Sequence, residues 1–112
     1  MTLGQLANAL NFEILTGDVN LEKVIKTGYV SDLLSDVIAN AEEDSVWITV
    51  QRHINILGVA KLKDIAGIII PRNLHVENEI IEKATNESIA ILKDHRSSFE
   101  IAGLIYNLLK RD

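Results

Sequence analysis

The residues best suited to chemistry in this chain of 112 residues are three arginines that each stand close to a histidine. The three clusters contain every histidine of the chain and three of its four arginines: Arg52 and His53, Arg72 and His75, and His95 and Arg96. An arginine guanidinium grips a phosphate or a carboxylate with a planar fork of N–H donors. The clusters therefore predict an anion-binding site, provided that the fold brings them together.

Each cluster follows a short apolar run that is typical of a buried strand. The runs are Val46–Val50, Ala66–Ile70 and Ser88–Leu92, and the polar stretches behind them are Gln51–Asn55, Pro71–Val76 and Lys93–Ser98. Continuous apolar strands are buried on both faces, as in a parallel sheet covered by helices. Ligands of such sheets bind outside the carboxyl ends of the strands, which is where all three polar stretches are expected to emerge.

The three polar stretches are basic in a chain that is acidic overall. They carry a formal charge of +3 and the rest of the chain carries −8, which gives the net charge of −5. Each stretch precedes a predicted helix, and helix N-termini favour anions over cations. Basic residues at such places are understandable if an anion lies between them. The alternative is that these are ordinary polar loops whose side chains extend into water.

The alternation of apolar strands with helical patterns predicts the fold class. Apolar residues at helical spacing predict helices at Thr2–Leu10, Ser31–Ala41, Ile56–Leu62, Glu77–Thr85 and Phe99–Lys110. Two further short strands are expected at Phe12–Leu15 and Leu21–Lys26. Ser31 is expected to be the N-cap of the second helix, with Asp32 in its first turn. The order predicts one domain over residues 1–112, a three-layer α/β/α fold with a mainly parallel central sheet.

Composition and motifs argue against several functions. The absence of cysteine leaves no disulfide and no thiolate metal site, and it suits a cytoplasmic protein. The net charge of −5 argues against nucleic acid, and no apolar run approaches the roughly 20 residues of a membrane span. The start of the chain lacks the pattern of a signal peptide. Three histidines in three loops can converge on zinc, but no paired histidine spacing supports a metal.

Catalytic motifs are not apparent either. The chain has no P-loop for nucleotide hydrolysis and no G-x-S-x-G elbow around a serine. Asp32 and Asp36 are four residues apart on a predicted helix, and we interpret them as an exposed acidic face. We therefore predict no catalytic residue, no cofactor and no enzymatic activity. An enzyme whose active site a partner chain completes is a third and weaker alternative.

The last predicted helix has more apolar surface than one sheet face requires. Its polar residues Glu100, Gly103, Asn107 and Lys110 form one narrow stripe, and apolar residues cover the rest of its circumference. A helix that packs on a sheet needs an apolar arc only somewhat wider than about 100°. The surplus predicts a homodimer through this helix, unless the first helix of the same chain covers it.

Three segments resemble the DRTGG domain, namely residues 28–37, 46–55 and 66–70, and the likeness continues at 83–84, 89–92 and 98–100. The resemblance implies a three-layer α/β domain similar to the N-terminal domain of HPr kinase/phosphorylase and to a region of some phosphotransacetylases. Such domains accompany a catalytic domain and are regarded as regulatory or ligand-sensing. Gln51-Arg52 stands where the family has Asp-Arg, and Pro71-Arg72-Asn73 where it has Thr-Gly-Gly, so only Arg52 carries over.

These observations predict a non-catalytic regulatory or ligand-sensing module that binds a small phosphate- or nucleotide-like anion at the carboxyl edge of the sheet. The candidate ligand-binding residues are Thr49, Arg52, His53, Asn55, Arg72, His75, His95 and Arg96. The alternative is a homodimeric protein–protein interaction adaptor with no small-molecule ligand, which uses the last helix to bind a protein partner.

Overall fold

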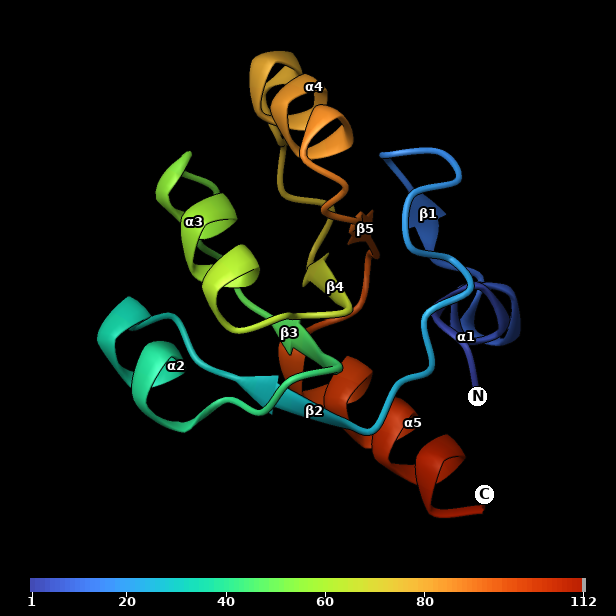
Figure 1. Cartoon of the computed structure of the whole chain (residues 1–112). Helices are drawn as coiled ribbons and strands as arrows, with labels where there is room; N and C mark the ends of the chain where they lie inside the picture. Colours follow the sequence, from blue (N-terminus) through green and yellow to red (C-terminus); the bar gives the residue numbers. More distant parts are fainter. Residues whose placement is uncertain (112) are drawn as a thin grey trace.

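A five-stranded sheet forms the centre of the structure, a computed structural model that describes residues 1–111, of which Arg111 in its backbone only (Figure 1). The strand order is β1-β5-β4-β3-β2. The central strands β3 (Ser45–Ile48) and β4 (Gly67–Ile70) lie parallel to each other, with β5 (Ile91–Lys93) beside β4 and β2 (Thr27–Val30) at the edge beside β3. The short strand β1 (Glu13–Ile14) pairs with β5 and is antiparallel. The expected mainly parallel sheet is confirmed.

Helices cover both faces of the sheet and make three layers. The helices α2 (Leu34–Asn40), α3 (Asn55–Leu62) and α4 (Asn78–Asn86) connect successive parallel strands and pack on one face (Figure 1). Crossovers of one hand between neighbouring strands place their helices on the same side. The helices α1 (Leu3–Leu10) and α5 (Ser98–Arg111) cover the opposite face. The predicted α/β/α class is therefore confirmed.

The alternation of side chains along the strands divides the core in two. Trp47, Ile68 and Ile70 point toward α2, α3 and α4, whereas Val46 and Ile48 point toward α1 and α5. All residues of β3 and β4 are buried, which explains why their sequences are continuous apolar runs instead of alternating patterns. The chemistry of this protein consequently has to lie at the strand ends or on the outer surfaces of the helices.

The segment before β2 differs from the sequence prediction. The strand predicted at Leu21–Lys26 is wrong: residues 21–22 form a turn, Val24 makes an isolated bridge to Thr2, and the strand begins at Thr27. The physical reason is that α1 uses this segment's backbone, since the amide of Leu3 donates to Lys23 O. Thr2 and Gln5 form a capping box at the start of α1. The strands predicted at 12–15 and 88–92 are shorter than expected.

The start of α2 also differs from the prediction. The helix begins at Leu34, and Ser31 Oγ accepts a hydrogen bond from Leu33 N instead of capping the helix. A polar anchor joins α2 to the edge strand: Tyr29 Oη donates to Asp36 Oδ2 over 2.8 Å, and Asn40 Nδ2 donates to Asp36 Oδ1 over 2.9 Å. Hydrogen bonds from Ser31, Tyr29 and Asn40 hold the pKa of Asp36 below its ordinary value of 3.8.

The lowered pKa of Asp36 predicts a pH-dependent contribution to stability. A carboxylate whose pKa is lower in the folded chain stabilises the fold above its ordinary pKa, and this contribution is lost as the pH falls through the folded pKa. Asp36→Asn should therefore be less stable than the parent at pH 7, and the gap should close below about pH 4. Urea unfolding at several pH values measures the gap. Glu82→Gln, on the exposed face of α4, controls for the lost charge. A gap that stays constant with pH would contradict this assignment.

Candidate functional site

The three basic stretches share one edge of the sheet. They follow β3, β4 and β5, which run parallel and side by side. Because the carboxyl ends of parallel strands meet at the same edge, all three stretches begin there. The side chains of the three stretches are therefore candidates for a common site.

An open hollow of about 360 Å³ lies between the stretches after β3 and β4. It is lined by Val50, Gln51, Arg52, His53, His75 and Glu77. Three of the eight predicted residues, Arg52, His53 and His75, are thus brought together. The two histidines are exposed, and the imidazole of His75 lies 3.8 Å from Glu77. The hollow combines one guanidinium, two imidazoles and the carboxylate of Glu77. The guanidinium and the imidazoles suit an anion, and Glu77 lies beside His75 at its rim.

The guanidinium of Arg52 joins the two walls of this hollow. Its Nη1 donates to the carbonyl oxygen of His75 over 2.8 Å, and its Nε donates to that of Val50 over 3.2 Å. A guanidinium has five N–H donors, so these two bonds leave others for a ligand. Arg52 therefore both shapes the hollow and presents a fixed cation to it.

Arg96 and His95 belong to a neighbouring cluster around a buried carboxylate. Asp94 is only 4% exposed, and its Oδ2 accepts from Arg96 N over 3.2 Å and lies 3.4 Å from Arg96 Nη1. The same Nη1 donates to the carbonyl of Leu10 over 3.1 Å. Buried carboxylates are costly unless they are paired, so Arg96 neutralises Asp94 and ties the end of α1 to this loop. His95 is exposed beside Asp94. Neither His95 nor Arg96 lines the hollow.

Thr49 and Asn55 do not line the hollow, but each bonds a residue that does. Thr49 is 1% exposed and lies beneath the edge, so its hydroxyl acts on the backbone of the loop. It accepts from Gln51 N over 3.1 Å. Asn55 is exposed at the start of α3, and its amide donates to His53 Nδ1 over 3.3 Å.

Asp32 is the important residue that the sequence prediction missed. Its Oδ1 accepts from Thr49 Oγ1 and from Val50 N, each over 2.9 Å, and its carbonyl accepts from Gln51 Nε2. The interpretation of Asp32 as part of an exposed helix face is wrong, because α2 begins two residues later. The signal lies in its position: once a strand is placed at Thr27–Val30, Asp32 falls at the same carboxyl edge as the basic loops.

Arg72 lies exposed in the turn that follows β4. Arg72 and Asn73 both have a positive φ, 55° and 52°, and they occupy the two positions where the family resemblance places glycines. Glycine is the residue that best tolerates positive φ. This chain therefore has arginine and asparagine at two positions whose backbone conformation favours glycine.

A metal site is not supported at this edge. Among residues 1–111, no three histidine or acidic side chains lie close enough to hold a metal ion. The histidines of the three basic stretches are therefore not gathered into a zinc site.

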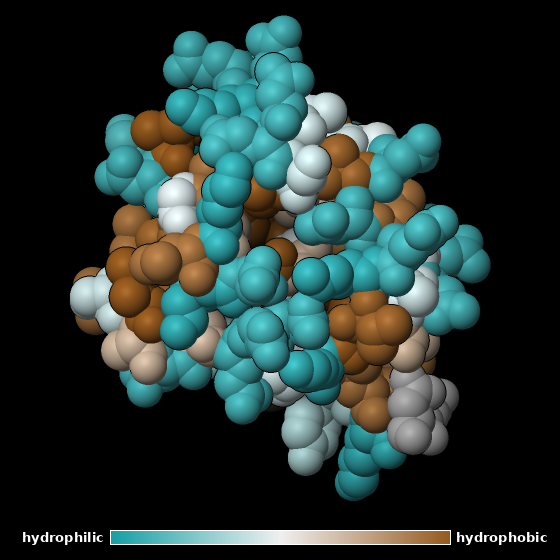
Figure 2. All heavy atoms as spheres, viewed as in Figure 1, coloured by the Kyte–Doolittle hydropathy of each residue, from teal (hydrophilic) through white to brown (hydrophobic). Residues whose placement is uncertain are grey.

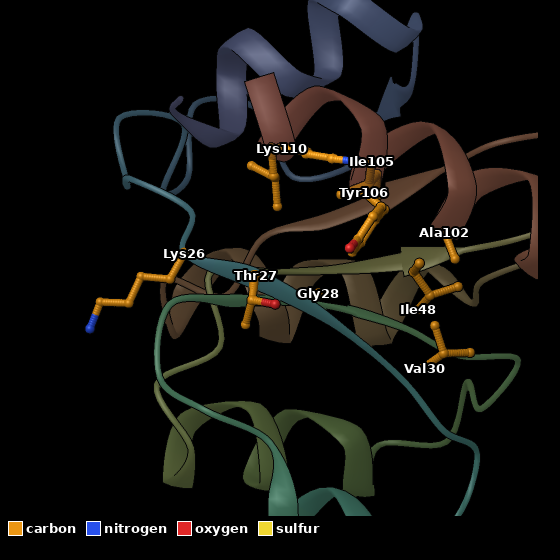
Figure 3. A pocket seen from close by; sticks show the side chains of 10 residues that line it. Lys26, Thr27, Gly28, Val30, Ile48, Ala102, Ile105, Tyr106 and Lys110 are labelled. Atoms are coloured by element: carbon orange, nitrogen blue, oxygen red, sulfur yellow. The ribbon is translucent and has the colours of Figure 1, made fainter. Parts of the chain in front are cut away.

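A second hollow, also of about 360 Å³, lies between the edge strand β2 and α5 (Figure 3). Gly28 and Ile48 contribute to its floor, and Ala102, Ile105 and Tyr106 on α5 form a wall. It is mostly apolar, with Lys26 and Lys110 at its lining. The ammonium of Lys26 bonds Glu43 over 3.3 Å, which raises the pKa of Lys26, and its side chain points away from the hollow in Figure 3.

The exposed apolar surface continues along α5 beyond this hollow. Phe99 is 88% exposed and Tyr106 is 70% exposed, and both lie on the stripe of α5 that contains Ala102. Figure 2, in the view of Figure 1, shows apolar side chains at the surface in several patches, whereas hydrophilic side chains cover α4 at the top. The predicted surplus of apolar surface on the last helix is therefore present. In the described part of the chain, no helix is long and apolar enough to cross a membrane.

The comparison with known families finds a match that covers nearly the whole chain. The model of a family described as the DRTGG domain matches residues 5–108. No curated protein has a sequence that matches significantly.

A solved structure shares the fold. It is the crystal structure of the CBS and DRTGG domains of the regulatory region of Clostridium perfringens pyrophosphatase, complexed with the activator diadenosine tetraphosphate. The TM-score is 0.72 at 19% sequence identity, and the match covers 93% of this chain and 45% of that chain. This chain therefore spans less than half of its structural neighbour, and the likeness shows the fold.

The role of Asp32 can be tested through stability. Asp32→Ala leaves the buried Thr49 hydroxyl and the Val50 amide without their acceptor, so we expect the free energy of unfolding to fall by about 2 kcal/mol. Urea unfolding at pH 7 measures the change. Glu82→Ala, an exposed substitution on α4, should stay within about 0.5 kcal/mol of the parent. The double variant Asp32→Ala/Thr49→Val should lose less stability than the sum of the losses in the two single variants. Strict additivity would refute the hydrogen bond between Asp32 and Thr49.

Proposed function

The chain belongs to the DRTGG domain family, and we propose that it is a regulatory module that binds a small anion, phosphate- or nucleotide-like, in the hollow beside β3 and β4. The observation that carries the proposal is that Arg52, His53 and His75, which come from two loops, line one hollow. The fork of Arg52 is held there by the carbonyl oxygens of Val50 and His75. A fixed cation loses less conformational freedom when it binds an anion than a mobile one does.

The distribution of charge supports the proposal. The basic stretches at this edge carry +3 in a chain of net charge −5. A local basic cluster in an acidic protein attracts a small anion to one place, whereas the whole surface disfavours large polyanions such as nucleic acid.

The structural neighbour supports the ligand class. The regulatory region that shares this fold is bound to diadenosine tetraphosphate, a nucleotide with several phosphates. We propose that this chain also senses a phosphorylated metabolite and that it has no catalytic activity of its own. We further propose that residues 1–112 act as one domain in the cytoplasm and that the domain is similar to the N-terminal domain of HPr kinase/phosphorylase.

A thermal-shift screen against inorganic phosphate, sugar phosphates and nucleotides tests the proposal. A ligand at 100 times its dissociation constant stabilises the fold by about 2.7 kcal/mol, which raises the melting temperature by several degrees. His53→Ala and His75→Ala should reduce this shift, because their exposed side chains line the hollow. His75→Ala should leave the unliganded protein within about 0.5 kcal/mol of the parent, since Arg52 bonds only the backbone of His75. His53→Ala also removes the acceptor of the Asn55 amide, so it should lower the unliganded stability by about 1 kcal/mol.

Two further variants complete this test. Arg52→Ala should abolish the shift but should also lower the unliganded stability by about 1 kcal/mol, since two hydrogen bonds are lost. His95→Ala removes an exposed histidine outside the hollow and should keep the full shift. If His53→Ala and His75→Ala respond to every phosphate compound as the parent does, the hollow is not the site.

The exposed stripe of α5 supports a second candidate function. Tyr106 and Val30, which line the hollow between β2 and α5, are more than half exposed, and so is Phe99 further along α5. Large exposed apolar patches mark interaction surfaces. We therefore propose, as the alternative, that the chain is a homodimeric adaptor that associates through α5 and can bind a protein partner there.

Sedimentation equilibrium tests this alternative. The parent should sediment at twice the chain mass of 12.4 kDa, and Phe99→Glu combined with Tyr106→Glu should sediment as a monomer, because a carboxylate cannot be buried in an apolar contact without cost. Leu62→Glu, at a 68% exposed position of α3 on the other side of the sheet, is the matched control and should remain dimeric. A monomeric parent at high concentration would refute the dimer.

A further inference from the structure

The turn that follows β4 holds Arg72 in an unusual conformation. Arg72 and Asn73 have φ values of 55° and 52°, and Leu74 N donates to Pro71 O over 3.2 Å, as in a type I′ turn. The neighbouring loop fixes this geometry, because Arg72 N donates to Arg96 O over 2.9 Å and Asn73 N donates to the carbonyl of Asp94 over 2.8 Å. Arg72 is therefore locked in place by the β5–α5 loop.

Arginine is an unusual residue for the positive φ that this turn requires at position 72. Seven residues other than glycine have a positive φ in the described part of the chain: Asn11, Asn20, Asp44, Asp64, Arg72, Asn73 and Ser88. Six of them have short polar side chains, and five of those six are Asn or Asp, the types that tolerate this region best. Arg72 alone has a long side chain. Residues that the surrounding structure holds in a strained conformation are concentrated at ligand sites and switches. The strain at Arg72 therefore calls for a functional explanation.

The guanidinium of Arg72 differs from those of the other two arginines at this edge. Arg52 and Arg96 bond carbonyl oxygens, and Arg96 also pairs with Asp94. Within residues 1–111, the guanidinium of Arg72 makes no hydrogen bond or ion pair, and the residue is exposed. All five of its N–H donors are consequently available to a ligand.

Arg72 also lies within reach of the proposed anion hollow. Arg72 is three residues before His75, which lines that hollow. The Cα atoms of the two residues are therefore at most about 11 Å apart. A ligand with one anionic group in the hollow can therefore present a second, linked group to Arg72. The fork of Arg72 suits two adjacent phosphate oxygens.

We propose that Arg72 is a specificity-determining residue that makes the site prefer a diphosphate group over a single phosphate, an inference that rests on the proposed function. The ligand class that follows is a compound with two linked phosphates, such as pyrophosphate or a nucleoside diphosphate. The hollow with Arg52 binds the first phosphate, and Arg72 binds the second, which distinguishes a diphosphate from a single phosphate. The turn fixes the backbone from which this donor extends, which gives a reason for arginine at this position despite the cost of a positive φ.

Titration calorimetry with inorganic phosphate and with pyrophosphate at one ionic strength tests this inference. The parent should bind pyrophosphate more tightly than phosphate. Arg72→Gly should weaken pyrophosphate binding by at least about tenfold, the equivalent of one charge-assisted hydrogen bond, and should change phosphate binding by less than twofold. Glycine suits the positive φ, so this variant should melt no lower than the parent.

Two matched variants separate the charge of Arg72 from the strain of its turn. Asn73→Gly relieves the backbone next to Arg72 and keeps the guanidinium, so it should retain the full preference for pyrophosphate. Arg72→Lys keeps the charge and the strain without the fork, and its preference should lie between those of the parent and Arg72→Gly. If Arg72→Gly still binds phosphate and still prefers pyrophosphate as the parent does, the role of Arg72 is overturned but the anion site is not. A parent that binds neither probe overturns the anion site itself.

Discussion

The burial of the central strands on both faces is the constraint on which the rest of the structure depends. Every residue of β3 and β4 is buried, between α2, α3 and α4 on one side and α1 and α5 on the other. Polar groups cannot lie along such strands without a partner, so they are displaced to the strand ends. The parallel order of β3, β4 and β5 then collects these ends at one edge. The basic edge is thus a consequence of how the core is built.

Bonds between side chains and backbone give that edge its shape before any ligand arrives. Asp32 fixes the end of β3 through Thr49, Arg52 bonds the carbonyl of His75, and Arg96 pairs with Asp94. The first two ties join segments that are distant in the sequence, and Arg96 makes a third such tie through its bond to the carbonyl of Leu10. Preorganisation of this kind lowers the entropic cost of binding, which is a property expected of a sensor that must respond to a small ligand. It also explains why Arg52 and Arg96 stabilise the fold as well as carry charge.

The sequence predicted most of the fold, because long apolar periodicity is a strong signal. The helices at α1, α3 and α5 and the central strands were predicted within a few residues. The edge strand β2 was missed because it is half exposed and contains Gly28, so it shows no apolar run. That miss also hid Asp32, whose position relative to β3 depends on where β2 ends. The composition of the edge was readable, but its division into a hollow with Arg52 and a separate cluster around Asp94 depends on loop conformations that spacing does not specify.

Chemical-shift mapping shows directly where on this domain a ligand binds. Amide resonances of the ¹⁵N-labelled chain would be followed during titration with ADP, at constant pH and ionic strength. If the anion binds in the hollow, the largest shifts occur in residues 51–55 and 72–76, which follow β3 and β4. Shifts confined to β2 and α5, around Gly28 and Tyr106, would contradict it and would place the working surface of this domain on its apolar side.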